Sequence, residues 1–82
     1  MANTLTCTIN GTRFTITRGD VIKAASNITP DTLRDHGVKI EGRIYPVKQV
    51  VSEVTGLDRL DFQSMQARSV LQRLDFELWR SA

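Results

Sequence analysis

The chain has 82 residues, 40% of them hydrophobic and 24% charged, with a formal net charge of +2. These values exclude a disordered chain and predict one globular domain spanning residues 1–82. The modest excess of basic residues permits nucleic-acid binding without requiring it. The single cysteine, Cys7, excludes an internal disulfide and any cysteine-cluster metal site.

The sequence also bears on where the protein is found. No apolar run approaches the roughly 20 residues that span a bilayer. The N-terminal run MANTLT lacks the charged segment and following apolar stretch of a secretory signal. Together with the single cysteine, these features lead us to expect a cytoplasmic protein that makes no membrane contact.

The first predicted element is a β-hairpin over residues 4–17. Apolar side chains alternate with threonines on both strands, and β-branched threonine favours an extended backbone. Asn10-Gly11 between the strands is typical of a type I′ turn. Thr17 then fits an N-cap and Asp20 completes a shortened capping box, so a helix is predicted from there to about residue 27.

A second, short helix is predicted next. Thr29 fits its N-cap, Pro30 its first helical position and His36-Gly37 its end. Residues 38–45 then alternate as two strands, with Gly42 in the tight turn between them. This region therefore predicts a second hairpin, or a bulged strand, after two short helices.

The stretch Gly42–Gly56 (GRIYPVKQVVSEVTG) leads from a strand into a helix. Pro46 fits the first helical position, Gly56 fits a left-handed stop, and valines recur between them at helical spacing. Such a corner leaves the first backbone N–H groups of the helix unpaired, here at residues 47–49, beside Lys48 and an aromatic ring. We interpret this corner as an anion site that contacts phosphate.

A plainer interpretation of the same corner stays open. Tyr45 would end a strand and pack its ring, Pro46 would start a helix, and Lys48 would be a surface cation. The functional interpretation requires four cations to share one side of the molecule: Lys39, Arg43, Lys48 and Arg59.

The C-terminal part predicts a linker, a helix and a strand. Residues 57–62 fit an irregular linker with three apolar anchors, Leu57, Leu60 and Phe62. Ser64 fits the cap of a last helix running to about Leu74, and Asp75 fits a left-handed stop. Residues 76–79 alternate as a closing strand. The predicted fold class is α+β, with an N-terminal β-hairpin and a small antiparallel sheet packed by three to four helices.

No catalytic site is predicted. The only histidine, His36, lies at a predicted helix C-terminus, where the dipole favours its charged form and no further role is needed. Cys7 has no evident base partner and fits a small buried apolar residue. Asp58 and Asp61 flank Arg59 as on a solvated surface. We therefore expect a protein that is not an enzyme and that uses no metal and no cofactor.

The predicted last helix is amphipathic. Its polar face contains no acidic residue and consists of Ser64, Gln66, Arg68, Ser69, Gln72 and Arg73. An acid-free face with two arginines is a mild signature of nucleic-acid contact, and Gln and Arg are able to make bidentate contacts to base edges. A merely solvated face is the alternative.

The corner also resembles a known family. The run Gly42-Arg43-Ile44-Tyr45-Pro46-Val47-Lys48 resembles the G-[KR]-x-Y-P-x-K signature of sulfur-binding domains in modification-dependent restriction endonucleases, which recognise phosphorothioate-modified DNA. Phe62, the run Gln66–Leu71 and the run Leu74-Asp75-Phe76 are similar to the closing helix of that family, which typically ends in L-x-x-L-G-F. The resemblance covers roughly the C-terminal half. The chain is also similar to small uncharacterised bacterial proteins with a Tyr-Pro-Val-Lys-Gln run, a likeness that implies no function.

The first resemblance implies roles for individual residues. Tyr45 and Pro46 would form a shallow apolar wall for the sulfur, which is larger, softer and less hydrated than the oxygen it replaces. Lys48 would contact the DNA backbone. The family commonly has a small residue at the next position, where this chain has the long, polar Gln49. Asp75 in place of the closing glycine is a second departure.

Together these observations predict a small DNA-binding domain that contacts phosphates, including those of phosphorothioate DNA. The residues predicted to bind DNA are Arg43, Tyr45, Pro46, Lys48, Gln49, Arg68, Gln72 and Arg73. The alternative is a protein-interaction module without nucleic-acid binding, either a homodimer or a partner-binding domain. Its hairpin would offer an edge strand for pairing, and Trp79 would anchor the interface.

Overall fold

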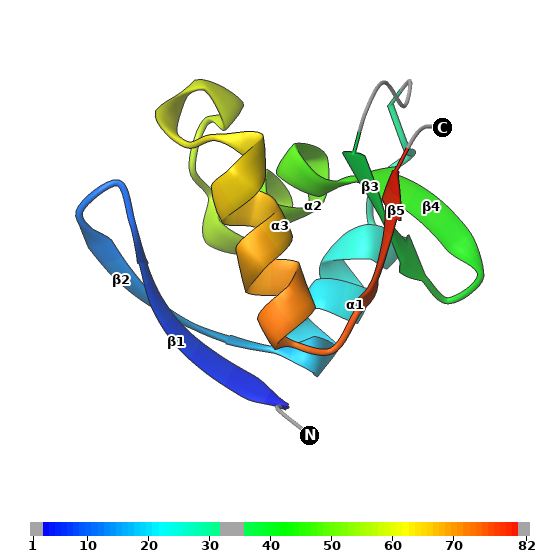
Figure 1. Ribbon diagram of the computed structural model, residues 1–82, viewed down its shortest axis with the longest axis horizontal. Coiled ribbons are helices and arrows are strands. Elements are labelled where there is room, and N and C mark those ends of the chain that lie inside the picture. Colours follow the sequence, from blue (N-terminus) through cyan, green and yellow to red (C-terminus); the bar gives the residue numbers. More distant parts are fainter. Residues whose placement is uncertain (1–2, 32–35, 81–82) are drawn as a thin grey trace.

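A computed structural model describes residues 3–31 and 36–80 and has the α+β fold that the sequence predicts (Figure 1). Its elements, in chain order, are β1 (Thr4–Ile9), β2 (Thr12–Thr17), α1 (Arg18–Ser26), β3 (His36–Ile40), β4 (Arg43–Pro46), α2 (Val47–Thr55), the 3-10 helix η1 (Arg59–Asp61), α3 (Ser64–Arg73) and β5 (Glu77–Arg80). In the described part of the chain, no helix has both the length and the hydrophobicity that crossing a bilayer requires.

The elements form three layers (Figure 1). The β1–β2 hairpin lies on one side, and an antiparallel sheet in the order β4-β3-β5 lies on the other. Helices α1, α2 and α3 lie between them, with α1 against β2 and α2, and α3 against both β1 and β3. The helices bury one face against each sheet, which gives a single continuous core.

Both hairpins turn through two residues with left-handed backbones. Asn10 and Gly11 have φ of 50° and 79°, and Glu41 and Gly42 have φ of 50° and 80°. This is the type I′ geometry, whose twist matches that of the strands it joins. The predicted hairpins are therefore confirmed.

The caps of α1 and α2 explain where these helices begin and end. The Thr17 hydroxyl accepts from the Asp20 N–H, and the Asp20 carboxylate accepts from the Thr17 N–H, as the capping box predicts. Gly56 ends α2 with a φ of 78°. Pro46 precedes the first helical residue rather than occupying it, because its ψ of 132° keeps it in β4. The prediction for Pro46 was thus wrong by one position.

Three other predictions need correction. His36 and Gly37 do not end a helix: they begin β3, and Gly37 pairs with both Pro46 and Trp79. Residues 29–31 are not helical, and residues 32–35 lie outside the described residues. Leu60 is 90% exposed and anchors nothing, although Phe62 is buried as expected. Ser64 is the first residue of α3, and Gln63 is its N-cap.

The predicted ends of α3 and the closing strand are otherwise confirmed. Asp75 has a φ of 64° and reverses the chain after α3, and β5 then pairs with β3. The apolar face of α3 is buried, as its spacing predicts: Ala67, Val70, Leu71 and Leu74. The rest of α3 is polar apart from Met65, which is 64% exposed.

Candidate nucleic-acid interface

The strand-to-helix corner divides its predicted residues between surface and core. Arg43 is exposed at the start of β4, and Pro46 is half-buried at its end. Tyr45 is only 4% exposed, so its ring belongs to the core and presents no wall to a ligand outside. Lys48 is half-buried, and its Nζ lies 5.7 Å from the centroid of the Phe62 ring. The corner therefore offers two cations and one proline edge at the surface.

Gln49 has a structural task at this corner. It is 7% exposed, its Nε2 donates to the Thr29 carbonyl at 2.8 Å, and its Oε1 accepts from the Asp31 N–H at 2.8 Å. Both ends of the amide are therefore occupied by backbone. Gln49 holds residues 29–31 against α2, and its buried amide is directed at the backbone and not at solvent.

The cations that the corner would need do not gather there. Arg59 forms an ion pair with Asp31, with 2.5 Å between Nη1 and Oδ2. Lys39 lies 3.8 Å from a carboxylate oxygen of Glu77. Each of these two charges is balanced by a carboxylate, so among the described residues only Arg43 and Lys48 of the four cations take part in no ion pair.

The arginines of α3 lie on different flanks of the helix. Five residues separate Arg68 from Arg73, which places them about 140° apart around the axis. Arg68 is half-buried, and its Nη1 lies 3.7 Å from the Met65 sulfur. Arg73 and Gln72 are exposed. The predicted polar face is therefore split, and only the Arg73 flank faces the hairpin.

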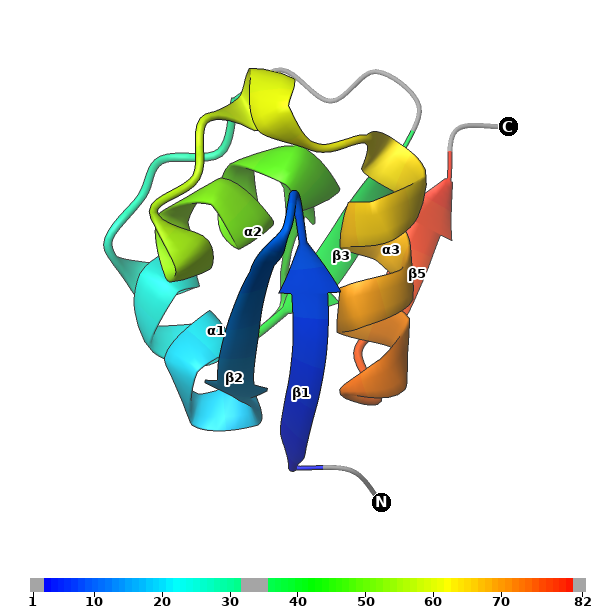
Figure 2. The ribbon, with the colours of Figure 1, turned by 90° about the vertical axis from the view of Figure 1, so that its left-hand side faces the viewer.

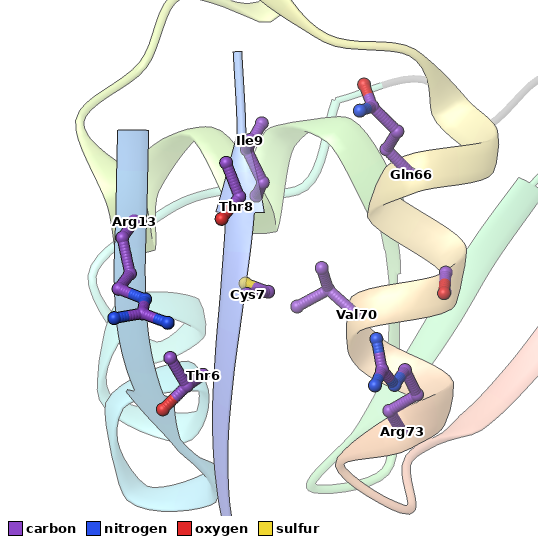
Figure 3. A pocket seen from close by; sticks show the side chains of 9 residues that line it. Thr6, Cys7, Thr8, Ile9, Arg13, Gln66, Val70 and Arg73 are labelled. Atoms are coloured by element: carbon purple, nitrogen blue, oxygen red, sulfur yellow. The ribbon is translucent and has the colours of Figure 1, made fainter. Parts of the chain in front are cut away.

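An open cleft of about 340 Å³ separates that flank from the hairpin (Figures 2 and 3). Figure 2 shows β1 between β2 and α3. Figure 3 shows Cys7 and Val70 pointing toward one another across the cleft, with Arg73 beside them. The residues that line it come from β1, β2 and α3: Thr6, Cys7, Thr8, Ile9, Arg13, Gln66, Ser69, Val70 and Arg73.

Hydrogen-bond donors and positive charge dominate this cleft. Neither β1–β2 nor α3 contains an aspartate or glutamate, and all nine acidic residues of the chain lie elsewhere. Among the described residues, Arg13 and Arg73 take part in no ion pair. The Oε1 of Gln66 accepts from the Gln63 N–H, which leaves the Gln66 amide donors free. The cleft is thus suited to an anionic ligand.

The field of Arg73 reaches the floor of the cleft. Burial raises the pKa of the Cys7 thiol above its usual value of 9.0, and the nearby positive charge of Arg73 opposes that rise. Cys7 is half-buried, in agreement with the small apolar role expected from the sequence.

Sequence reasoning found Arg73 but missed the hairpin side of this cleft. Arg13, Thr6 and Thr8 were treated only as strand residues. A signal was present, because residues 3–19 include two arginines and no acidic residue.

Within the described ranges, no group of three or more His, Cys, Asp and Glu side chains is placed to hold a metal ion.

The comparisons with known proteins add a family. None of the curated proteins and none of the solved structures matches this chain. The model of the SCO5918-like family matches residues 5–82, nearly the whole length. The chain therefore belongs to the SCO5918-like family.

Proposed function

We propose that this protein is a small non-enzymatic domain that binds the phosphate backbone of DNA. The observation that carries the proposal is the acid-free surface formed by the β1–β2 hairpin and α3, with Arg13 and Arg73 unpaired on it. A DNA partner and the single cysteine both fit a cytoplasmic location.

The chemistry of this surface favours phosphate over other ligands. Guanidinium groups donate two parallel hydrogen bonds to phosphate oxygens, and threonine and serine hydroxyls add neutral donors. Acidic side chains would repel the polymer, and the hairpin and α3 carry none. The exposed outer face of the hairpin extends this surface through Thr6, Thr8 and Thr15. Contacts of this kind position a protein on DNA without reading its sequence.

Salt dependence tests the proposal. With two phosphate contacts, the slope of log K against log salt is about −1.8, so a fourfold rise in salt lowers affinity by about 12-fold. Arg73→Ala and Arg13→Ala should each weaken binding of a labelled duplex in fluorescence anisotropy and flatten the slope by about 0.9.

Lys23→Ala is the matched control. Lys23 is an exposed cation on α1 beside Asp20 and Glu53, so removing it changes the net charge equally without touching the proposed surface. If the Lys23→Ala and Arg73→Ala variants weaken DNA binding equally, the loss of affinity comes from the change in net charge alone, and the proposed surface is contradicted.

A preference for phosphorothioate DNA is a separate proposal that rests on the resemblance at Gly42–Lys48. The edge of Pro46 and the charge of Lys48 support it, whereas the burial of Tyr45 removes part of the apolar wall. Plain and phosphorothioate duplexes of equal sequence should be titrated against wild-type protein and Pro46→Ala. A preference for the modified duplex that Pro46→Ala abolishes would support this proposal, and equal affinities would reject it.

A further inference from the structure

The hairpin layer is one strand short of the layer opposite. The sheet on the far side of the helices has three strands, whereas β1 pairs only with β2 among the described strands. Beyond the open edge of β1, the flank of α3 that carries Gln66, Ser69 and Arg73 is exposed. Figure 2 shows α3 beside β1 on the side away from β2, and the open cleft lined by both elements is where a third strand of the hairpin layer would lie.

The backbone of β1 presents hydrogen-bonding groups to this gap. Across a two-residue turn, the flanking residues Ile9 and Thr12 form a hydrogen-bonded pair, and such pairs alternate along the ladder. Thr6 and Thr8 therefore fall in the other class of pair, and their N–H and C=O groups point away from β2. Both residues line the cleft. The cleft thus has an unpaired strand edge as one wall.

We propose that an acidic, extended segment of a partner protein binds in this cleft as a third strand along β1. This interaction goes beyond DNA binding, because it uses the backbone edge of β1 as well as the arginines. The ten residues of α3 extend for about 15 Å, which matches four or five residues of an added strand. Such strand addition gains affinity from main-chain hydrogen bonds and specificity from alternate side chains.

The wall of the cleft selects the side chains of that segment. Alternate residues of an added strand would face α3, where they meet an apolar floor at Cys7 and Val70 and the cation Arg73. A segment in which an apolar residue is followed two positions later by Asp or Glu would place the first side chain on the apolar floor and the second beside Arg73. The absence of acidic residues from the lining favours a negatively charged partner over a basic one.

A second copy of this chain fits the cleft less well. The β1 sequence, TLTCTI, has no acidic residue to offer Arg73. Pairing two β1 edges around a two-fold axis would also bring together the two α3 flanks that carry Arg73, and like charges repel. The occupant that the charges favour is therefore a different, acidic chain.

The test uses the unmodified protein and designed peptides. A fluorescent eight-residue peptide of sequence TVTETVTE, in which each valine is followed two positions later by a glutamate on the same face of the strand, is titrated by anisotropy, beside two versions N-methylated on alternate residues. An added strand turns one set of amides toward β1 and the other toward solvent. We expect the parent peptide to bind, one N-methylated version to bind at least about tenfold more weakly, and the other to bind as the parent does. In parallel, the amide resonances of Thr6 and Thr8 should shift.

Charge reversal supplies the second measurement. The Arg73→Glu variant should no longer bind the glutamate peptide and should bind a matched peptide with lysine in place of glutamate. The Arg68→Glu variant, changed on the other flank of α3, should bind both peptides as the wild type does. Failure of the peptide to bind, or equal binding of both N-methylated versions, would overturn the proposal even if DNA binds. A concentration-dependent dimer in light scattering that excludes the peptide would overturn it in favour of a second copy.

Discussion

The guanidinium of Arg18 lies over the ring of Phe76, 4.2 Å from its centroid, and its Nη1 donates to the carbonyl of Leu74. This side chain joins the first turn of α1 to the end of α3, 56 residues later in the sequence. The Leu74 carbonyl belongs to the last turn of a helix, where carbonyls have no helical partner and a cation is favoured. Arg18 is therefore a structural cation rather than part of the DNA surface.

We predict that Arg18→Ala lowers the free energy of unfolding by about 2–4 kcal/mol, the sum of a charged hydrogen bond and a cation–π contact. Arg18→Lys should recover part of this loss, because it keeps the charge near the ring. Urea unfolding followed by circular dichroism measures both. Arg13→Ala removes an exposed arginine of the hairpin and should change stability by less than about 0.5 kcal/mol. Equal losses for Arg18→Ala and Arg13→Ala would refute the structural role.

The amide of Gln49 supports a second stability prediction. Its two hydrogen bonds, to the Thr29 carbonyl and from the Asp31 N–H, are the described links between α2 and the segment after α1. Gln49→Met preserves volume but leaves two backbone groups without partners, so we expect a loss of about 1–3 kcal/mol. Gln72→Met, at an exposed position of α3, serves as the control. Faster exchange of the Asp31 amide would locate the effect, whereas an unchanged exchange rate would contradict it.

The sequence predicted the parts of this fold that depend on neighbouring residues. Asn10-Gly11 dictates its turn through backbone conformation alone, and Thr17 with Asp20 closes a cap within three residues. The failure at His36-Gly37 has the opposite origin. A glycine after a short helical pattern predicts a stop, but Gly37 pairs with Pro46 in the next strand and with Trp79, some 40 residues later in the chain. Non-local pairing outweighed the local signal.

The candidate site was harder to predict for the same reason. The plainer interpretation of the corner predicts that the Tyr45 ring packs inward, and it does. Nothing near Gln49 in the sequence indicates that its amide turns inward, because its backbone partners, Thr29 and Asp31, lie elsewhere in the chain. The cleft needs β1 and α3 side by side, and 60 residues separate Arg13 from Arg73 along the chain. Composition identified an acid-free helix. Only the fold brings an acid-free hairpin beside it.

Substitution of two glycines by alanine should change the stability of the protein in opposite directions. Gly11 has a φ of 79° with open space around it, so Gly11→Ala meets no clash but forces a left-handed backbone on alanine. We expect a loss of about 1 kcal/mol. Gly19 lies in the first turn of α1, and a Cβ there would meet only the Thr17 hydroxyl at 3.7 Å. Gly19→Ala should therefore stabilise by about 0.5–1 kcal/mol. Thermal unfolding that shifts both variants in the same direction would contradict this assignment.

The reactivity of Cys7 reports on the charge inside the cleft. Burial raises the pKa of its thiol above 9.0, and the Arg73 cation opposes that rise. The thiolate is the anion, so removing the cation disfavours it: Arg73→Ala should raise the pKa further and slow alkylation by iodoacetamide near pH 9. Arg73→Lys should retain most of the rate.

The same shift fixes a pH dependence of stability. A thiol whose pKa is higher in the folded state loses its proton more readily when unfolded, so its contribution to stability is complete below pH 9.0 and is lost as the pH rises toward the folded value. The free energy of unfolding should therefore fall above pH 9 in the wild type, and less steeply in Cys7→Ala.

Arg68→Ala, on the opposite flank of α3, should leave the alkylation profile of Cys7 unchanged. If Arg68→Ala slows alkylation as much as Arg73→Ala does, the charge felt by Cys7 is that of the whole protein and not of the cleft.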